Sequence, residues 1–250
     1  MVFFLSEHRV LLDGNRVSDW PNVRGKSIFN YLVTHRRRPV PREVLMNLFW
    51  PEVGSEAARN NLNVAIYGLR KALAKSKSCM PYVLFKDGCY FLNPELDVWV
   101  DGEAFLNLVG IAAEQERAGR TDEAMRIYHE AEAMYENEYL VESRYEDWLL
   151  EVRSKFENAY HSITDRLSAY HLERSEFEPA IAVCQRMLSI NVCDEESHRR
   201  LMRCYNYLGH YHLSLRQFHI CRDALERELH VPPSLTTIQL YDEIRKRKAA

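Results

Sequence analysis

The stretch SEAARNNLNVAIYGLRKALAK, residues 55–75, is the most informative part of this chain. Its apolar residues recur at steps of three and four, a spacing that predicts an amphipathic helix with one buried stripe. The stripe consists of Ala58, Leu62, Ala65, Ile66, Leu69, Ala72 and Leu73. This helix is therefore expected to dock on a core by one side and to present its other side outward.

The outward side of this helix has the side chains that a DNA-binding helix needs. It is expected to carry Arg59, Asn60, Asn63, Tyr67, Arg70, Lys71 and Lys75, and no acidic residue. Because Arg and Lys neutralise phosphates and Asn can form paired hydrogen bonds with adenine, such a side suits a major groove. An ordinary amphipathic helix with a solvated basic face is the alternative interpretation, since polar helix faces are common.

The surrounding segments predict a winged helix, a helix-turn-helix variant that carries a β-hairpin. The expected elements are strands at 2–5, 10–12 and 16–17, helices at 26–35, 42–49 and 55–75, and strands at 82–85 and 89–92. Asp13-Gly14 is a hairpin turn signal, and Ser55 is the expected N-cap of the third helix. In this order the third helix enters the major groove, and the last hairpin, the wing, touches the adjacent backbone or minor groove, with Lys86 as its contact residue. The alternative is a small α+β domain with another role.

The sequence from residue 101 onward is helical nearly throughout and repeats after 34 residues. The matched pairs are Leu167 with Leu201, His171 with Tyr205, Phe177 with Tyr211, Ile181 with Leu215 and Cys184 with Phe218. This period is that of the tetratricopeptide repeat, in which each helical hairpin buries a face by stacking on its neighbour. Residues 119–128 resemble the second helix of an earlier unit, displaced in phase by an insertion around 139–148.

Composition and charge narrow the functional classes. The chain has 250 residues, 46% hydrophobic and 28% charged, and no apolar run approaches the roughly 18–20 residues of a membrane span. Residues 1–100 hold 14 Lys and Arg against 9 Asp and Glu, whereas residues 101–250 hold 19 against 27. This asymmetry favours an anionic polymer as the partner of the first half.

The cysteines indicate the compartment. The six cysteines form no CxxC pair, which suits reduced thiols in the cytoplasm.

Motifs for catalysis and metal binding are missing from the sequence. It contains no GxSxG, no GxxxxGK[ST] and no GxGxxG, and its nine glycines do not cluster. The closest metal-type pairs are His210-x-His212 and His219-x-Cys221, whose members point to different helix faces. The sequence therefore predicts a protein that is not an enzyme and that uses neither a metal nor another cofactor.

The whole chain resembles the Streptomyces antibiotic regulatory protein (SARP) type of transcriptional activator. That architecture joins a response-regulator-type winged helix to a tetratricopeptide-like bacterial transcriptional activation domain. The matching segments are 44–51, 58–62, 69–73, 88–92 and 98–101 with Phe105, then 145–148 with Arg153, 195–202, Gly209 and 225–232. The resemblance implies an α+β winged helix-turn-helix domain at 1–100 and an all-α tetratricopeptide-like domain at 101–250. Gly68 departs from it, because related winged helices often carry a base-reading Arg there.

This resemblance implies a cytoplasmic activator that binds promoter DNA and recruits RNA polymerase. The expected DNA-contacting residues are Arg59, Asn60, Asn63, Val64, Tyr67, Arg70, Lys71 and Lys86. Trp50 and Glu52, in the loop before the third helix, are the expected polymerase contacts. Activators of this kind act on direct repeats, so a second copy is expected head to tail on the same DNA.

Two other functions fit the sequence. One is a protein–protein adaptor, in which the winged helix is a docking module and the repeats bind a peptide. The other is a small-ligand-responsive module cut from a larger signalling regulator, with the effector bound by the helical domain. The operator, the target genes and the activating signal are not encoded in any motif that can be recognised here.

Overall fold

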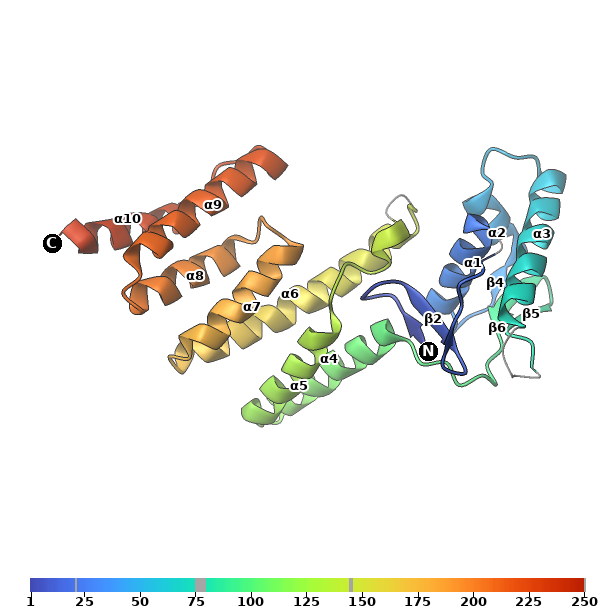
Figure 1. Cartoon of the computed structure of the whole chain (residues 1–250), viewed down its shortest axis with the longest axis horizontal. Coiled ribbons are helices and arrows are strands. Elements are labelled where there is room, and N and C mark those ends of the chain that lie inside the picture. Colours follow the sequence, from blue (N-terminus) through green and yellow to red (C-terminus); the bar gives the residue numbers. More distant parts are fainter. Residues whose placement is uncertain (21, 75–79, 144–145, 250) are drawn as a thin grey trace. The chain divides into compact units, whose positions relative to one another are not determined.

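The computed structural model describes residues 1–20, 22–74, 80–143 and 146–249 (Figure 1). Lys75 of the predicted basic face and Tyr145 of the family motif lie outside the described residues. Contacts define two compact units: Met1–Ala104 with Tyr139–Val152, and Phe105–Glu138 with Arg153–Ala250. Among the helices in the described ranges, none combines the length and the apolar character needed to cross a membrane. The functional boundary expected at residue 100 stays a prediction.

The first unit has the element order of a winged helix. Its elements are β1 (Val2–Phe3), β2 (Arg9–Leu12), β3 (Asn15–Arg16), α1 (Val23–Thr34), β4 (Val40–Pro41), α2 (Arg42–Phe49), α3 (Ser55–Leu73), β5 (Val83–Lys86) and β6 (Cys89–Leu92). The first three strands form one antiparallel sheet, and β4, β6 and β5 form another in that order. The pairing of β4 with the wing has no counterpart among the strands predicted from the sequence.

Both hairpin turns are built by an Asp-Gly pair. Asp13 and Gly14 have φ angles of 50° and 81°, and Asp87 and Gly88 have 51° and 77°. Positive φ at both central residues matches the twist of the flanking strands, and Asp-Gly adopts it readily. Because Lys86 pairs with Cys89, the wing turn has only two residues, and Lys86 ends β5 instead of lying in the turn.

The predicted stripe of α3 is confirmed, since all seven of its residues are buried. Helix α3 packs on α1 and α2, whose buried side chains include Ile28, Leu32, Leu45 and Phe49. The predicted cap is wrong: Gly54 precedes the helix without a side-chain bond, and Ser55 is its first residue.

Helix α1 begins earlier than the spacing predicted, at Val23 instead of Lys26. Asn22 accounts for the difference, because its Oδ1 accepts a hydrogen bond of 2.6 Å from the Gly25 amide. An Asn at this position satisfies one of the amide groups that a helix start leaves unpaired.

A segment from the second half of the sequence completes the first unit. We call Tyr139–Val152 the return segment; it contains a short 3-10 helix, Val141–Ser143. It lies on α1, where Glu142 pairs with Lys26 at 2.8 Å and the Tyr139 hydroxyl meets Thr34 Oγ1 at 2.9 Å. The Trp148 ring packs edge-on against Tyr31 at 4.9 Å. The predicted insertion is therefore part of the winged-helix core.

Asp101 fixes the edge of this unit. Its carboxylate accepts hydrogen bonds of 2.8 Å from the amides of Phe4 and Leu5, nearly one hundred residues away in sequence. Burial raises the pKa of Asp101, and these amide bonds oppose that rise. The carboxylate therefore ties the first strand region to the start of the next helix.

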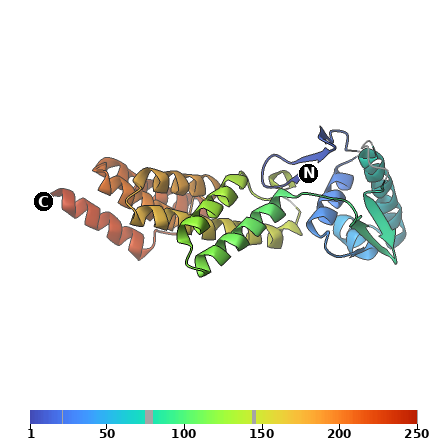
Figure 2. The same ribbon diagram turned by 90° about the horizontal axis from the view of Figure 1, so that it is seen from below.

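The second unit consists of helical hairpins (Figures 1 and 2). Its helices, the first and third of which start within the first unit, are α4 (Asp101–Arg117), α5 (Thr121–Met134), α6 (Leu149–Glu173), α7 (Phe177–Ile190), α8 (Glu195–Tyr207), α9 (Tyr211–Leu229) and α10 (Leu235–Ala249). Helices α7 and α9 begin 34 residues apart, which confirms the predicted repeat. The turns before α5, α7 and α9 contain positive-φ residues, Gly119, Ser175 and Gly209. The last core cluster joins Met202, Phe218 and Ile244.

Candidate nucleic-acid interface

The outward side of α3 presents four residues in one row. Asn60, Val64, Tyr67 and Lys71 are separated by four, three and four positions, so they follow one line along a helix with 3.6 residues per turn. All four are exposed, Val64 to 66% and Tyr67 to 70%. We call these four residues the outer row. It lies opposite the buried stripe and is the part of α3 best placed to meet a partner.

Arg59, Asn63 and Arg70 flank the outer row on one side, and all three are exposed. Arg70 has a structural contact as well, because its Nε donates a 3.1 Å hydrogen bond to the Val83 carbonyl of β5. This bond ties α3 to the wing and occupies one of the five donors of the guanidinium. The structure therefore brings seven of the eight predicted DNA-contacting residues onto one side of α3.

The two predicted base-reading asparagines have uncommitted amides. Within the described residues, the side chains of Asn60 and Asn63 form no hydrogen bond with another protein group. An exposed amide keeps both its donors and its acceptor available, which paired recognition of a base edge requires. Neither asparagine is needed to hold the helix in place.

One feature of this side was predicted wrongly. Glu56 lies four residues before Asn60, in the first turn of α3, and it is exposed. The side is therefore not free of acidic residues. A carboxylate in the first turn is favourable for the helix itself, because it faces the positive end of the helix dipole.

The wing adds one predicted residue and one that the sequence analysis missed. Lys86 is exposed at the end of β5, as expected for a phosphate contact. Phe85, immediately before it, is 45% exposed and packs on Tyr90 with ring centroids 4.5 Å apart. Phe85 shares one side of β5 with Val83, because side chains alternate along a strand, but Val83 is buried and Phe85 is exposed.

The loop before α3 separates the two predicted polymerase contacts. Trp50 is partly buried and packs at 6.2 Å against the ring of Phe49. Glu52 is exposed in the following turn. Only Glu52 therefore presents its functional group fully to solvent, while Trp50 also anchors the loop.

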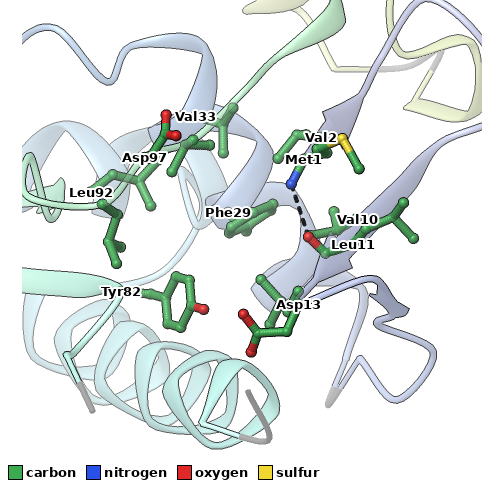
Figure 3. Close-up of a pocket in the computed structure, with 13 residues that line it drawn as sticks. Met1, Val2, Val10, Leu11, Asp13, Phe29, Val33, Tyr82, Leu92 and Asp97 are labelled. Atoms are coloured by element: carbon green, nitrogen blue, oxygen red, sulfur yellow. Dashed lines mark hydrogen bonds between the residues drawn. The ribbon is translucent and has the colours of Figure 1, made fainter. Parts of the chain in front are cut away.

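A partly open cavity of about 240 Å³ lies in the first unit, lined by the N-terminal strands, by α1 and by residues from 82 to 98 (Figure 3). Phe29 and Val33 are among its apolar lining residues, and Asp13 and Asp97 are its two acidic lining residues. The Met1 amino group faces the cavity and donates a 2.9 Å bond to the Leu11 carbonyl. Burial lowers the pKa of that amino group. The cavity is smaller than most pockets for drug-sized ligands, which span about 300–1,000 Å³.

Two of the His and Cys residues in the second unit, His198 and Cys184, are buried in its packing. His198 bonds to the Val192 carbonyl at 3.0 Å and to the Gln217 amide at 2.6 Å. Burial raises the pKa of Cys184 to about 12, so its thiol is not ionised at neutral pH. In the part of the chain that the structure describes, no three His, Cys, Asp or Glu side chains are grouped to hold a metal ion.

Comparison with known families adds to this geometry. The profile of the bacterial transcriptional activator domain matches residues 100–245. The chain belongs to this family. A second profile, transcriptional regulatory protein, C terminal, matches residues 23–88, which include α1, α2 and α3. This combination identifies a SARP-type transcriptional activator, with a winged helix followed by a tetratricopeptide-like domain.

A solved structure shares the fold of this activator. EmbR of Mycobacterium tuberculosis, solved in complex with a low-affinity phosphopeptide, matches with a TM-score of 0.74 and 18% identity. The match covers 98% of this chain but only 65% of EmbR, and at this identity it shows the fold alone. The C-terminal TPR-containing domain of a Plasmodium falciparum FK506-binding protein matches 60% of this chain and 91% of its own, at 14% identity. Its TM-score of 0.41 is too low to show a shared fold. A search of curated proteins finds no match.

Proposed function

We propose that this activator binds double-stranded promoter DNA with the outer row of α3 in the major groove. The observation that carries the proposal is the row itself, in which exposed amide, apolar and basic side chains project from a helix docked by its opposite side. Membership of a transcriptional activator family supports it. The helical unit would then serve the activation step.

Distinct roles follow for the residues of this surface. Asn60 and Asn63 contact base edges, because uncommitted amides can pair with adenine. Arg59, Lys71 and Lys86 contact phosphates, since each is an exposed cation. Arg70 holds the wing through the Val83 carbonyl, and because its side chain is exposed it also contributes a phosphate contact. Tyr67 packs within the groove beside the asparagines.

The loop from Trp50 to Gly54 is proposed to contact RNA polymerase. Glu52 is its exposed charged group, and it lies just before α3 instead of on the outer row. A contact at this point leaves the base-reading side chains free. Two copies are proposed to bind direct repeats head to tail, with half-site centres about 10–11 base pairs apart, so that both α3 helices lie on one side of the duplex.

Binding of the full chain to fluorescent promoter fragments at several salt concentrations tests this proposal. Each phosphate neutralised by Arg59, Lys71 or Lys86 contributes about −0.9 to the slope of log K against log salt. We expect a slope of about −3 per bound copy from these three cations. An Arg59→Ala/Lys71→Ala protein should bind weakly with a shallower slope. Unchanged binding by that variant would exclude α3 from the interface.

The cavity of Figure 3 supports one second candidate function, response to a small ligand. The sequence predicted such a ligand in the helical domain, whereas this cavity is in the first unit. A thermal-shift screen of small organic cations with Asp97→Asn as control tests it. A shift that the control abolishes supports the ligand role, and no shift with any compound argues against it.

A further inference from the structure

We infer that Val64 reads a thymine by its methyl group, so that each half-site contains a thymine within about two base-pair steps of the adenine bound by Asn60 or Asn63. The inference rests on the proposed function and adds the base composition that the outer row recognises. It starts from the one apolar aliphatic side chain among the four residues of that row.

Val64 is 66% exposed in the middle of α3, between Asn60 one turn earlier and Lys71 two turns later. A branched valine side chain is short and stiff at χ1, so it cannot extend sideways to a phosphate as Lys or Arg can. When the outer row faces the floor of a major groove, Val64 therefore meets base edges. An exposed valine alone is ordinary for a protein surface. Its position between polar base-reading candidates is what distinguishes this one.

Thymine is the base whose edge suits an apolar side chain. In the major groove the other bases offer only hydrogen-bond donors and acceptors beside their ring carbons, while thymine adds a C5 methyl group. Placing Val64 on a polar edge would desolvate that edge without giving it a partner, which is costly. Packing on the methyl group removes apolar surface of both molecules from water instead.

The centre of the outer row has no side chain of the kind that usually recognises guanine. Guanine is read most often by Arg, and the two arginines of α3, Arg59 and Arg70, both flank the row. Arg70 is tied to the Val83 carbonyl. Gly68 has no side chain to offer, and Lys71 lies about 10 Å beyond Val64 along the helix at 1.5 Å per residue. The centre is therefore suited to A·T pairs.

Helix geometry sets the spacing between the two bases. Asn60 and Val64 are four residues apart, about 6 Å along the axis. Base pairs follow one another at about 3.4 Å. The thymine is thus expected within about two base-pair steps of the adenine.

The experiment begins with selection of bound duplexes from a random library by the full chain. Each thymine of the selected half-site is then replaced by deoxyuridine, which removes the C5 methyl group and leaves the hydrogen-bonding pattern intact. We expect one replacement per half-site to weaken binding about fourfold, the equivalent of about 0.8 kcal/mol for one buried carbon. Val64→Ala should bind both duplexes equally. Val192→Ala, which changes an exposed valine of the second unit, should keep the fourfold difference.

The outcomes distinguish a failure of thymine recognition by Val64 from a failure of the proposed DNA binding. Salt-sensitive binding to a half-site without thymine, or a methyl effect that persists in Val64→Ala, would overturn the inference and leave the proposed function standing. Failure of the full chain to select any duplex would overturn both. Val64 is exposed, so the fold should survive its truncation, and matching thermal melts of the two valine variants check this.

Discussion

Helices α3 and α8 carry similar basic residues and use them in opposite ways. On α8, Arg200 has an 11% exposed side chain and pairs with Asp165 at 2.7 Å and Glu196 at 3.1 Å. On α3, Arg59 and Lys71 are exposed, and within the described residues neither forms an ion pair. Charge on a helix therefore does not by itself indicate a partner; what matters is whether the chain supplies the counter-charge.

The difference has a physical basis in solvation. Besides its two ion pairs, Arg200 donates hydrogen bonds to the Asp165 carbonyl at 2.9 Å and to Ser168 Oγ at 2.6 Å. Removing it leaves acceptors that were arranged for a cation, so its loss is expected to reduce stability. An exposed lysine can be removed at almost no cost to folding. Substituting a polar side chain that has partners within the protein should thus reduce its stability. Substituting an exposed one without such partners should instead affect DNA binding.

The largest expected effect is on stability, and it concerns Arg200, whose charge is paired within the protein. Arg200→Met keeps the apolar stem but removes the ties from α8 to α6, and we expect a loss of about 3 kcal/mol in the free energy of unfolding. Urea titration followed by circular dichroism measures it. Arg203→Met is the control, since Arg203 is 43% exposed and reaches Glu196 only at 4.0 Å. Equal losses from both would mean that burial of the pair is irrelevant.

Acid should weaken the first unit through His8. Burial, with the nearby charge of Lys26, lowers the pKa of His8 to about 4, although its Nε2 bonds to Asn30 Oδ1 at 2.9 Å. An unfolded His takes up a proton near pH 6.5, so the unfolded state binds more protons between pH 6.5 and 4. The stability contributed by neutral His8 is therefore present above pH 6.5 and lost toward pH 4, by about 2–3 kcal/mol.

Tryptophan fluorescence measures this loss selectively. All four tryptophans of the chain, Trp20, Trp50, Trp99 and Trp148, belong to the first unit. Urea midpoints at pH 7 and pH 4.5 should differ much less in His8→Gln than in the natural chain. A pH dependence that is the same in both proteins would assign the acid sensitivity to other groups.

The third-largest effect is expected for the exposed residues of α3, and it is an effect on DNA binding. Truncating whichever of Asn60 and Asn63 reads a base should weaken binding by about 1–3 kcal/mol and relax preference at one position. Asn61→Ala is the matched control, because Asn61 is exposed on the same helix but turned about 100° from Asn60. Anisotropy titrations against a set of single-base variants provide the measurement. A sequence-independent loss in every variant would remove the asparagines from base recognition.

A smaller loss is expected from the phosphate contacts. Lys71→Ala should weaken binding to all sequences similarly, by about 0.5–1 kcal/mol, and reduce the salt slope by about 0.9. Lys155→Ala removes an exposed lysine of α6 and should change neither quantity. If the two variants behave alike, the charge of α3 acts only through the general field of the protein.

The smallest effect on DNA affinity is expected at Glu52. Glu52→Lys should leave binding within about 0.5 kcal/mol, as for a surface substitution outside the interface, while run-off transcription falls. Both are measured on the same protein. Loss of both activities would place the loop in DNA binding or folding, and loss of neither would remove it from activation.

Local patterns predicted most of the architecture. The seven stripe residues of α3, the Asp-Gly turns and the 34-residue repeat each depend on neighbours in sequence, and each is found in the structure. Periodicity carries this information because side chains three or four apart share a helix face. The proposed contacts of the outer row stay predictions, although their exposure is as expected.

Long-range contacts could not be anticipated in the same way. Nothing in the local pattern indicates that the Arg70 side chain bonds to the Val83 carbonyl, or that Asp101 accepts from Phe4. The return segment is the clearest case: its packing on α1 joins residues more than one hundred positions apart, such as Lys26 and Glu142. Such pairs depend on tertiary arrangement, which spacing within one segment does not encode.

The return segment also sets the order of events during synthesis. The winged-helix unit needs Tyr139–Val152, yet 34 residues of the helical unit, Phe105–Glu138, are made in between. A ribosome adding about 5–20 residues per second needs roughly 2–10 s to pass from Ala104 to Val152. During that interval the surface of α1 that later receives Trp148 stays uncovered on the nascent chain. Chaperones that bind exposed aromatic surface could therefore bind α1 during this interval, before Trp148 covers it.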